Sequence, residues 1–84
     1  MGNKKRNNLE MTGDILAFLA EYNTGETAHA VSKGVSAQGM LTTTYLKEMK
    51  RKGLVREKWG KYKATRKGLD LLYDINQILK KVPA

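Results

Sequence analysis

The sequence predicts a small, mainly α-helical domain that carries one short β-hairpin toward its C-terminal end. Apolar residues recur at helical spacing in three segments before residue 53 and in one segment after residue 65. Between them, residues 54–58 and 61–65 form two short segments separated by a residue pair that ends in glycine, which is typical of a tight hairpin. Because the chain has 84 residues and no cysteine, we expect one domain without disulfides or cysteine-ligated zinc.

The first predicted helix covers residues 9–22, where apolar side chains gather on one side of a helical wheel and acidic side chains on the other. Asn8 is the predicted N-cap of this helix, and residues 23–25 end it. Residues 1–8 are polar and basic and lack an apolar anchor. We therefore expect a flexible basic arm ahead of a domain that covers residues 9–84.

The second and third predicted helices are separated by a short turn. Thr27 is expected to cap a short second helix that Gly34 ends, and residues 36–39 form the turn. The third helix then runs from about Met40 to Lys52. The helix face that we expect to be buried holds Tyr45, Leu46 and Met49, with Thr42 and Thr43 on its flank. The face that we expect to point outward holds Met40, Thr44, Lys47 and Arg51.

The predicted hairpin turns at Trp59 and Gly60, and its inner face is expected to carry Tyr62 and Ala64. Thr65 is expected to cap a last helix that begins at Arg66 and runs to about residue 82. The resulting order of helix, helix, turn, helix, hairpin and helix is that of a winged helix-turn-helix. In this fold the third helix enters the major groove of DNA and the hairpin, or wing, lies against the phosphate backbone.

The distribution of charge agrees with such a partner. The net charge is +8, and residues 47–67 carry ten basic and two acidic residues, whereas the rest of the chain carries six of each. Positive charge that only kept the protein soluble would be scattered along the chain, whereas charge that binds a polyanion would be concentrated in one region. The alternative interpretation is a charged face that only water contacts. The candidate DNA-contacting residues are Gln38, Met40, Thr44, Lys47, Arg51, Arg56, Lys58, Trp59, Lys61 and Lys63.

Two of these candidates leave alternatives open. Trp59, the only tryptophan, either contacts the nucleic acid or packs on its own hairpin. Gln38 either hydrogen-bonds a base or phosphate or serves only the turn before the third helix. The function classes also stay open at this point, because a winged helix with this charge fits a transcriptional regulator, an architectural nucleoid protein, or an RNA-associated or protein-interaction module.

Apolar residues in the last helix exceed the needs of one small domain. Leu71, Ile75, Ile78 and Val82 follow a four-three-four spacing that makes a narrow seam, with Leu69, Leu72, Tyr73 and Leu79 beside it. We expect one set to pack on its own domain and the seam to meet a second copy in a homodimer. The alternative is a helix that caps its own monomer with a wide apolar face.

The sequence also resembles a known group of proteins. Tyr45-Leu46, Met49 and Gly53-Leu54-Val55, followed by Tyr62, Ala64-Thr65, Gly68 and Leu71-Leu72, resemble a pattern of winged-helix regulators. Met49 and Ala64 stand where that pattern has leucine. The chain is similar to the small archaeal chromatin-associated winged-helix proteins, and more loosely to MarR-like and PadR-like repressors. The resemblance implies binding to double-stranded DNA and dimerisation through a C-terminal helix that forms an antiparallel coiled coil.

Catalysis finds no support in the sequence. The chain has a single histidine, His29, no cysteine, and no glycine-rich phosphate loop, so neither a nucleophile–base pair nor a metal or cofactor site is expected. The longest apolar run, Ile15–Ala20, is too short to cross a membrane, and the N-terminal residues lack the apolar stretch of a secretory signal. We therefore expect a cytoplasmic, nucleoid-associated protein without a small-molecule substrate.

Overall fold

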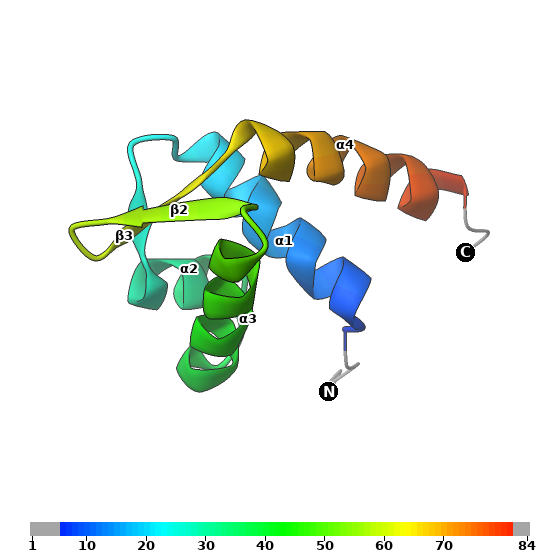
Figure 1. Cartoon of the computed structure of the whole chain (residues 1–84). Coiled ribbons are helices and arrows are strands. Elements are labelled where there is room, and N and C mark those ends of the chain that lie inside the picture. Colours follow the sequence, from blue (N-terminus) through cyan, green and yellow to red (C-terminus); the bar gives the residue numbers. More distant parts are fainter. Residues whose placement is uncertain (1–5, 82–84) are drawn as a thin grey trace.

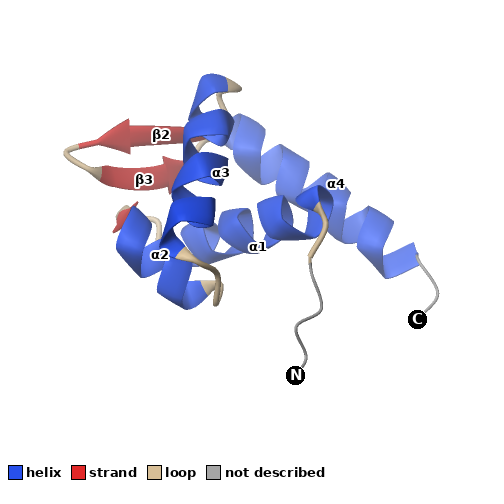
Figure 2. Cartoon of the chain, turned by 90° about the horizontal axis from the view of Figure 1, so that it is seen from below, coloured by secondary structure: helices blue, strands red, loops and turns tan. Residues whose placement is uncertain are grey.

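The computed structural model describes residues 6–81, and it confirms a mainly helical fold with a small antiparallel sheet (Figure 1). In chain order the elements are α1 (Asn8–Glu21), β1 (Glu26–Thr27), α2 (Ala28–Gly34), α3 (Gly39–Arg51), β2 (Val55–Lys58), β3 (Lys61–Ala64) and α4 (Arg66–Lys81). Helices α1, α2 and α3 form the body of the domain. The β2–β3 hairpin projects from one side of this body, and the C-terminal end of α4 extends from the opposite side (Figures 1 and 2).

Helix α1 begins one residue earlier than the sequence predicts. Its N-cap is Asn7, whose side chain accepts a hydrogen bond from the Glu10 amide at 2.8 Å, while the Glu10 carboxylate accepts one from the Asn7 amide at 3.0 Å. This reciprocal capping box favours Asn7 over Asn8, because the cap then has a glutamate three residues ahead of it. The predicted boundary of the arm at residue 8 is therefore wrong for residues 6–8, and residues 1–5 lie outside the described residues.

The apolar core lies between α1, α2, α3 and the inner face of the sheet. Its fully buried side chains include Ile15, Leu16, Leu19, Val31 and Leu46. Helix α4 crosses α1 closely at Gly13, where a Cβ atom would lie 3.0 Å from the Cγ2 atom of Ile75. The glycine that costs α1 some helix propensity thus allows α4 to pack against it.

Helix α3 buries a different set of residues from the predicted one. Leu46 and Met49 are buried as expected, but Thr42 is fully buried and Tyr45 is only partly buried. The Thr42 hydroxyl forms no hydrogen bond within the described residues. Tyr45 instead lies at the edge of the core, where its hydroxyl donates to the Asn8 side-chain oxygen at 2.6 Å and links α3 to the start of α1.

The hairpin and the start of α4 agree with the sequence prediction. The sheet also contains one strand that the sequence did not predict. Trp59 and Gly60 have positive φ angles of 56° and 76°, as a two-residue turn between antiparallel strands requires. The Thr65 hydroxyl accepts a hydrogen bond from the Gly68 amide at 3.0 Å and thereby caps α4. The sequence did not reveal β1, which pairs with β3 and makes the strand order β1-β3-β2, because two residues are too few for an alternating pattern.

Candidate nucleic-acid interface

The predicted outward face of α3 is exposed throughout. Met40 is 83% exposed, and Thr44, Lys47 and Arg51 are exposed about one, two and three turns further along the helix. The Thr44 hydroxyl donates to the Met40 carbonyl at 3.0 Å, so its oxygen still has lone pairs to offer as an acceptor. Gln38 is the N-cap residue of α3, and its exposed side chain makes no capping hydrogen bond. Its amide group is therefore available to a partner.

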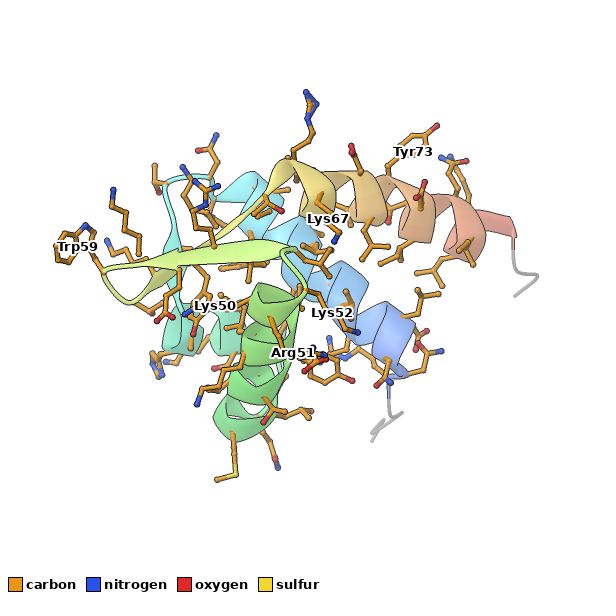
Figure 3. The ribbon with its side chains drawn as sticks, viewed as in Figure 1. Lys50, Arg51, Lys52, Trp59, Lys67 and Tyr73 are labelled. Carbon is orange, nitrogen blue, oxygen red and sulfur yellow. The ribbon has the colours of Figure 1, made fainter. Side chains whose placement is uncertain are left out.

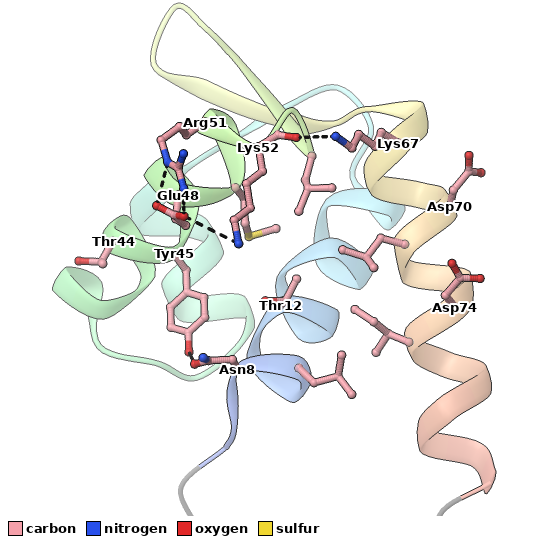
Figure 4. A pocket seen from close by; sticks show the side chains of 15 residues that line it. Asn8, Thr12, Thr44, Tyr45, Glu48, Arg51, Lys52, Lys67, Asp70 and Asp74 are labelled. Carbon is pink, nitrogen blue, oxygen red and sulfur yellow. Dashed lines mark hydrogen bonds and ion pairs between the residues drawn. The ribbon is translucent and has the colours of Figure 1, made fainter.

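Two cations on this face differ in their surroundings. The Arg51 guanidinium bonds both carboxylate oxygens of Glu48, and Lys52 approaches the same carboxylate at 3.8 Å (Figure 4). The hydrogen bond from Arg51 is the main cause of the lowered pKa of Glu48. Lys47 forms no ion pair with any residue in the range 6–81. Lys47 is thus the cation on this face whose full charge is available.

An ion pair joins α3 to the wing. The Lys50 ammonium lies 2.8 Å from a carboxylate oxygen of Glu57 in β2, and this hydrogen bond raises the pKa of Lys50. Glu57 therefore marks the side of β2 that faces α3. Because side chains alternate along a strand, Arg56 and Lys58 point to the opposite side. The wing cations consequently lie on the face of the hairpin that points away from α3.

The outer face of the wing brings four cations together. Arg56 lies directly opposite Lys63, and Lys58 lies directly opposite Lys61, in the register of the hairpin. Like charges in directly opposite positions destabilise a hairpin. None of the four pairs with a carboxylate within the part of the chain that the structure describes. Such an arrangement costs stability in the free protein, and a bound polyanion would relieve it.

Trp59 lies at the tip of the wing and points away from the body of the domain (Figure 3). Its residue surface is 89% exposed, so the interpretation that it packs back on its own hairpin is wrong. The residue also has a left-handed φ of 56°, which residues other than glycine, asparagine and aspartate rarely adopt. Neither the packing nor the backbone of the free protein explains a tryptophan here.

The structure adds three cations that sequence reasoning had not assigned to the site. Besides Lys50, they are Lys52 and Lys67, which lie where the end of α3 meets the start of α4 (Figure 3). The Lys67 ammonium donates to the Lys52 carbonyl at 3.0 Å. This proximity depends on Gly68, because any Cβ there would lie 2.1 Å from the Leu54 carbonyl oxygen. The concentration of charge in residues 47–67 was the available signal, but it could not place α4 beside α3.

Comparison with known proteins agrees with this geometry over most of the chain. A model of the winged helix-turn-helix family matches residues 5–82. The chain belongs to this family. A comparison with curated protein sequences finds no match.

Two solved structures share the winged helix-turn-helix fold. ZitR of Lactococcus lactis is 19% identical with a TM-score of 0.68, over 93% of this chain and 57% of that protein. MepR, a transcription regulator of the Staphylococcus aureus multidrug efflux pump MepA, is 21% identical with a TM-score of 0.69, over 84% of this chain and 57% of that protein. The chain thus spans a little over half the length of these two regulators.

Helix α4 of this winged helix-turn-helix domain packs differently from the prediction. Ile75, a predicted dimer contact, is only 1% exposed in the single chain because it packs against α1 at Gly13. A partner has no surface of this side chain left to bury, so its place in the seam is corrected. Leu71 is partly buried against the core, and Val82 lies outside the described residues. The apolar side chains of α4 that remain exposed are Leu69, Tyr73, Ile78 and Leu79.

An open groove of about 1240 Å³ runs between α1, α3 and α4 (Figure 4). Its apolar lining includes Leu9, Met49, Leu54, Leu71 and Ile75, and its charged lining includes Glu48, Arg51, Lys52, Lys67, Asp70 and Asp74. No cluster of three or more residues that could hold a metal ion occurs among residues 6–81. Among the same residues, no helix has both the length and the apolar character of a membrane span.

Proposed function

We propose that this protein binds duplex DNA, with α3 in the major groove and the wing against the phosphate backbone, as a transcriptional regulator or an architectural nucleoid protein. The observation that carries the proposal is the set of like-charged pairs across the wing, Arg56 with Lys63 and Lys58 with Lys61. A protein that gained nothing from this face would keep its stability by placing a carboxylate there. A DNA backbone supplies the missing anions and releases counterions as it does so.

The proposed roles within α3 follow from position along the helix. Recognition helices contact base edges mainly through residues in their N-terminal part. Gln38, Met40 and Thr44 occupy that part of α3, and the exposed Met40 side chain suits a thymine methyl group. Lys47 follows as a base or phosphate contact. Arg51 is ion-paired with Glu48, and we assign it to a contact with the DNA phosphate backbone.

The wing supplies contacts of a second kind. Its cations face away from the side on which Lys50 and Glu57 join the hairpin to α3, so they suit the phosphates that border the groove rather than the bases within it. Trp59 extends beyond them and suits insertion into the minor groove or stacking on a base. The protein is accordingly proposed to work at the nucleoid, in the cytoplasm, without cofactor or catalytic step.

We also infer a homodimer that uses the exposed apolar residues of α4. Leu69, Tyr73, Ile78 and Leu79 expose more apolar surface on one helix than scattered surface residues would. The resemblance to archaeal chromatin-associated winged-helix proteins, which pair through a C-terminal helix, supports this inference. Tyr73→Asp combined with Ile78→Asp should give a monomer that stays folded, because both residues are at least half exposed. Light scattering at micromolar concentration measures the mass, and a wild-type mass of one chain would refute the dimer.

The binding experiment uses a fluorescently labelled duplex titrated with the full chain at several salt concentrations. If a dimer neutralises about six to ten phosphates, log affinity against log salt should have a slope of about −5 to −9. A slope near zero would remove the nucleic-acid proposal. Double-stranded RNA serves as the competitor: if it displaces the DNA at equal concentration, the RNA-associated alternative replaces the DNA proposal.

A further inference from the structure

We propose that Trp59 selects duplex DNA in which one base step is already unstacked or easily opened, such as a mismatch or a flexible pyrimidine–purine step, by placing its indole ring against the face of a base. This inference rests on the proposed function and deepens it, because it names the class of duplex that the wing prefers. DNA binding by α3 and the wing cations requires no such preference.

The ring of Trp59 is held in water with almost none of its surface covered. A Cβ atom on the neighbouring Gly60 would have no atom within 4 Å, so the tip of the wing borders open space. Phe18 and Tyr22 pack ring against ring near the end of α1, whereas Trp59 forms no aromatic pair within the part of the chain that the structure describes. Both apolar faces of the indole are therefore available to a partner.

The hairpin carries this ring clear of the domain (Figure 3). Val55, the first residue of β2, is buried, and Trp59 follows it by four residues, which is roughly 13 Å of extended strand. The minor groove of B-DNA is about 6 Å wide and about 7.5 Å deep. A single indole ring can enter it, while the paired strands behind the ring, about 5 Å apart and flanked by side chains, stay outside.

Two cations lie immediately behind the ring. Lys58 and Lys61 are directly opposite each other across the hairpin, and both are exposed. Neither forms an ion pair with a residue in the range 6–81. An aromatic face flanked by two ammonium groups matches a nucleotide, which joins a flat base to an anionic phosphate. This combination favours nucleic acid over an apolar protein surface as the partner of Trp59.

The chemistry of the ring favours base faces over groove edges. The floor of the minor groove presents mainly hydrogen-bond acceptors, whereas the indole has one N–H donor and is otherwise apolar. Only the face of a base can cover a face of the ring, and in a regular duplex the neighbouring bases already cover it. Opening a step costs free energy, and the cost is least where the bases are mispaired or the step is flexible.

Three duplexes of equal length and charge test this preference with the full chain. Their flanking sequences are identical, and their central steps are a stiff A-tract, a TA step and a single mismatch. Affinity, measured by the anisotropy of a label on the DNA, should rise in that order, by roughly tenfold from the A-tract to the mismatch. Because Trp59 is the only tryptophan, quenching of the protein's fluorescence reports stacking at this residue and should be greatest with the mismatch.

Substitutions at the tip separate stacking from charge. Trp59→Asn should bind the three duplexes with equal affinity, and it should fold, because asparagine suits the left-handed φ of this turn. Trp59→Phe keeps a ring with two apolar faces and should retain most of the preference. Lys58→Gln is the matched control at the neighbouring position. It should weaken binding to all three duplexes by the same factor and leave their order unchanged.

The outcomes distinguish this inference from the proposed function. Steep salt dependence with equal affinity for the three duplexes, or a preference that survives Trp59→Asn, would overturn the role of Trp59 and leave DNA binding intact. Failure to bind any of the duplexes would overturn both. Vesicles of anionic lipid provide the last comparison. If they shift the tryptophan emission to the blue while no duplex changes it, Trp59 is a membrane contact and the inference is wrong.

Discussion

The wing and helix α4 both project from the body of the domain, in opposite directions, and they leave different surfaces unsatisfied (Figure 1). The wing places cations opposite one another and holds Trp59 in water, while α4 leaves apolar side chains such as Tyr73 and Ile78 exposed. The first surface lowers the stability of the free protein through electrostatic repulsion, and the second through the exposure of apolar side chains to water. In the proposed function each cost is relieved by a partner of different chemistry, a polyanion for the wing and an apolar helix for α4.

The largest expected effect separates the part of α4 that packs on α1 from the part nearer its C-terminal end. Ile75→Ala should lower the free energy of unfolding by about 2–5 kcal/mol, because Ile75 is buried against α1. Ile78→Ala should cost only about 1 kcal/mol, because half of this residue's surface is already in water. Urea denaturation at two protein concentrations measures both. Equal losses would mean that Ile78 is as deeply buried as Ile75.

Reversing charge on one strand of the wing should have the next largest effect. Lys61→Glu with Lys63→Glu turns both like-charged cross-strand pairs into opposite pairs. Stability should rise by about 0.2–1 kcal/mol per pair, while DNA affinity should fall at least about a hundredfold. Thermal melting and fluorescence anisotropy report the two quantities. The control, Lys33→Glu with Lys80→Glu, changes the net charge equally on α2 and α4, and an equal loss of affinity there would mean that the wing has no special role.

Trp59→Asn tests the tip of the wing without disturbing its turn. Asparagine followed by glycine is the preferred pair for a turn in which both residues have positive φ, so the hairpin should become more stable. DNA affinity should fall by about 1–3 kcal/mol if the indole ring stacks or inserts. Affinity that survives the substitution would restrict the contribution of the wing to its cations.

The smallest effect concerns the inner face of the wing. Burial, followed by the negative charge of Glu57, raises the pKa of Tyr62 above its ordinary value. The folded state therefore favours the neutral phenol, and this contribution to stability is complete below about pH 10 and is lost as the pH rises through the raised pKa. Tyr62→Phe should show a weaker loss of stability above pH 10 in melting experiments. An identical alkaline profile would place Tyr62 outside the core.

The sequence predicted the order of the four helices and the hairpin, the hairpin turn and the outward face of α3, because each depends on local periodicity or turn chemistry. It did not predict which apolar strip of α4 meets its own core. That choice depends on where α4 crosses α1. The two helices approach closely at Gly13, and this contact between distant residues cannot be read from the sequence. In α3, periodicity likewise could not tell that Thr42 lies deeper in the core than Tyr45.

The candidate site was predictable to the same extent. Residues on α3 and the wing follow from their spacing, and they are exposed where the sequence places them. The hydrogen bond from the Arg6 guanidinium to the Ser36 carbonyl, in the turn before α3, joins residues 30 positions apart, and no pattern in the sequence marks such a contact. The cations of α4 and of the end of α3 come together for the same reason, through packing at Gly68.

The ion pair between Lys50 and Glu57 has a consequence for how the proposed affinity for DNA should change with ionic strength. It links α3, the proposed recognition helix, to strand β2 of the wing. Both side chains are partly in water, so dissolved ions weaken the pair. Raising the ionic strength should therefore weaken this link between α3 and the wing at the same time as it screens the DNA phosphates. The measured salt dependence should accordingly exceed what the number of phosphate contacts alone would give.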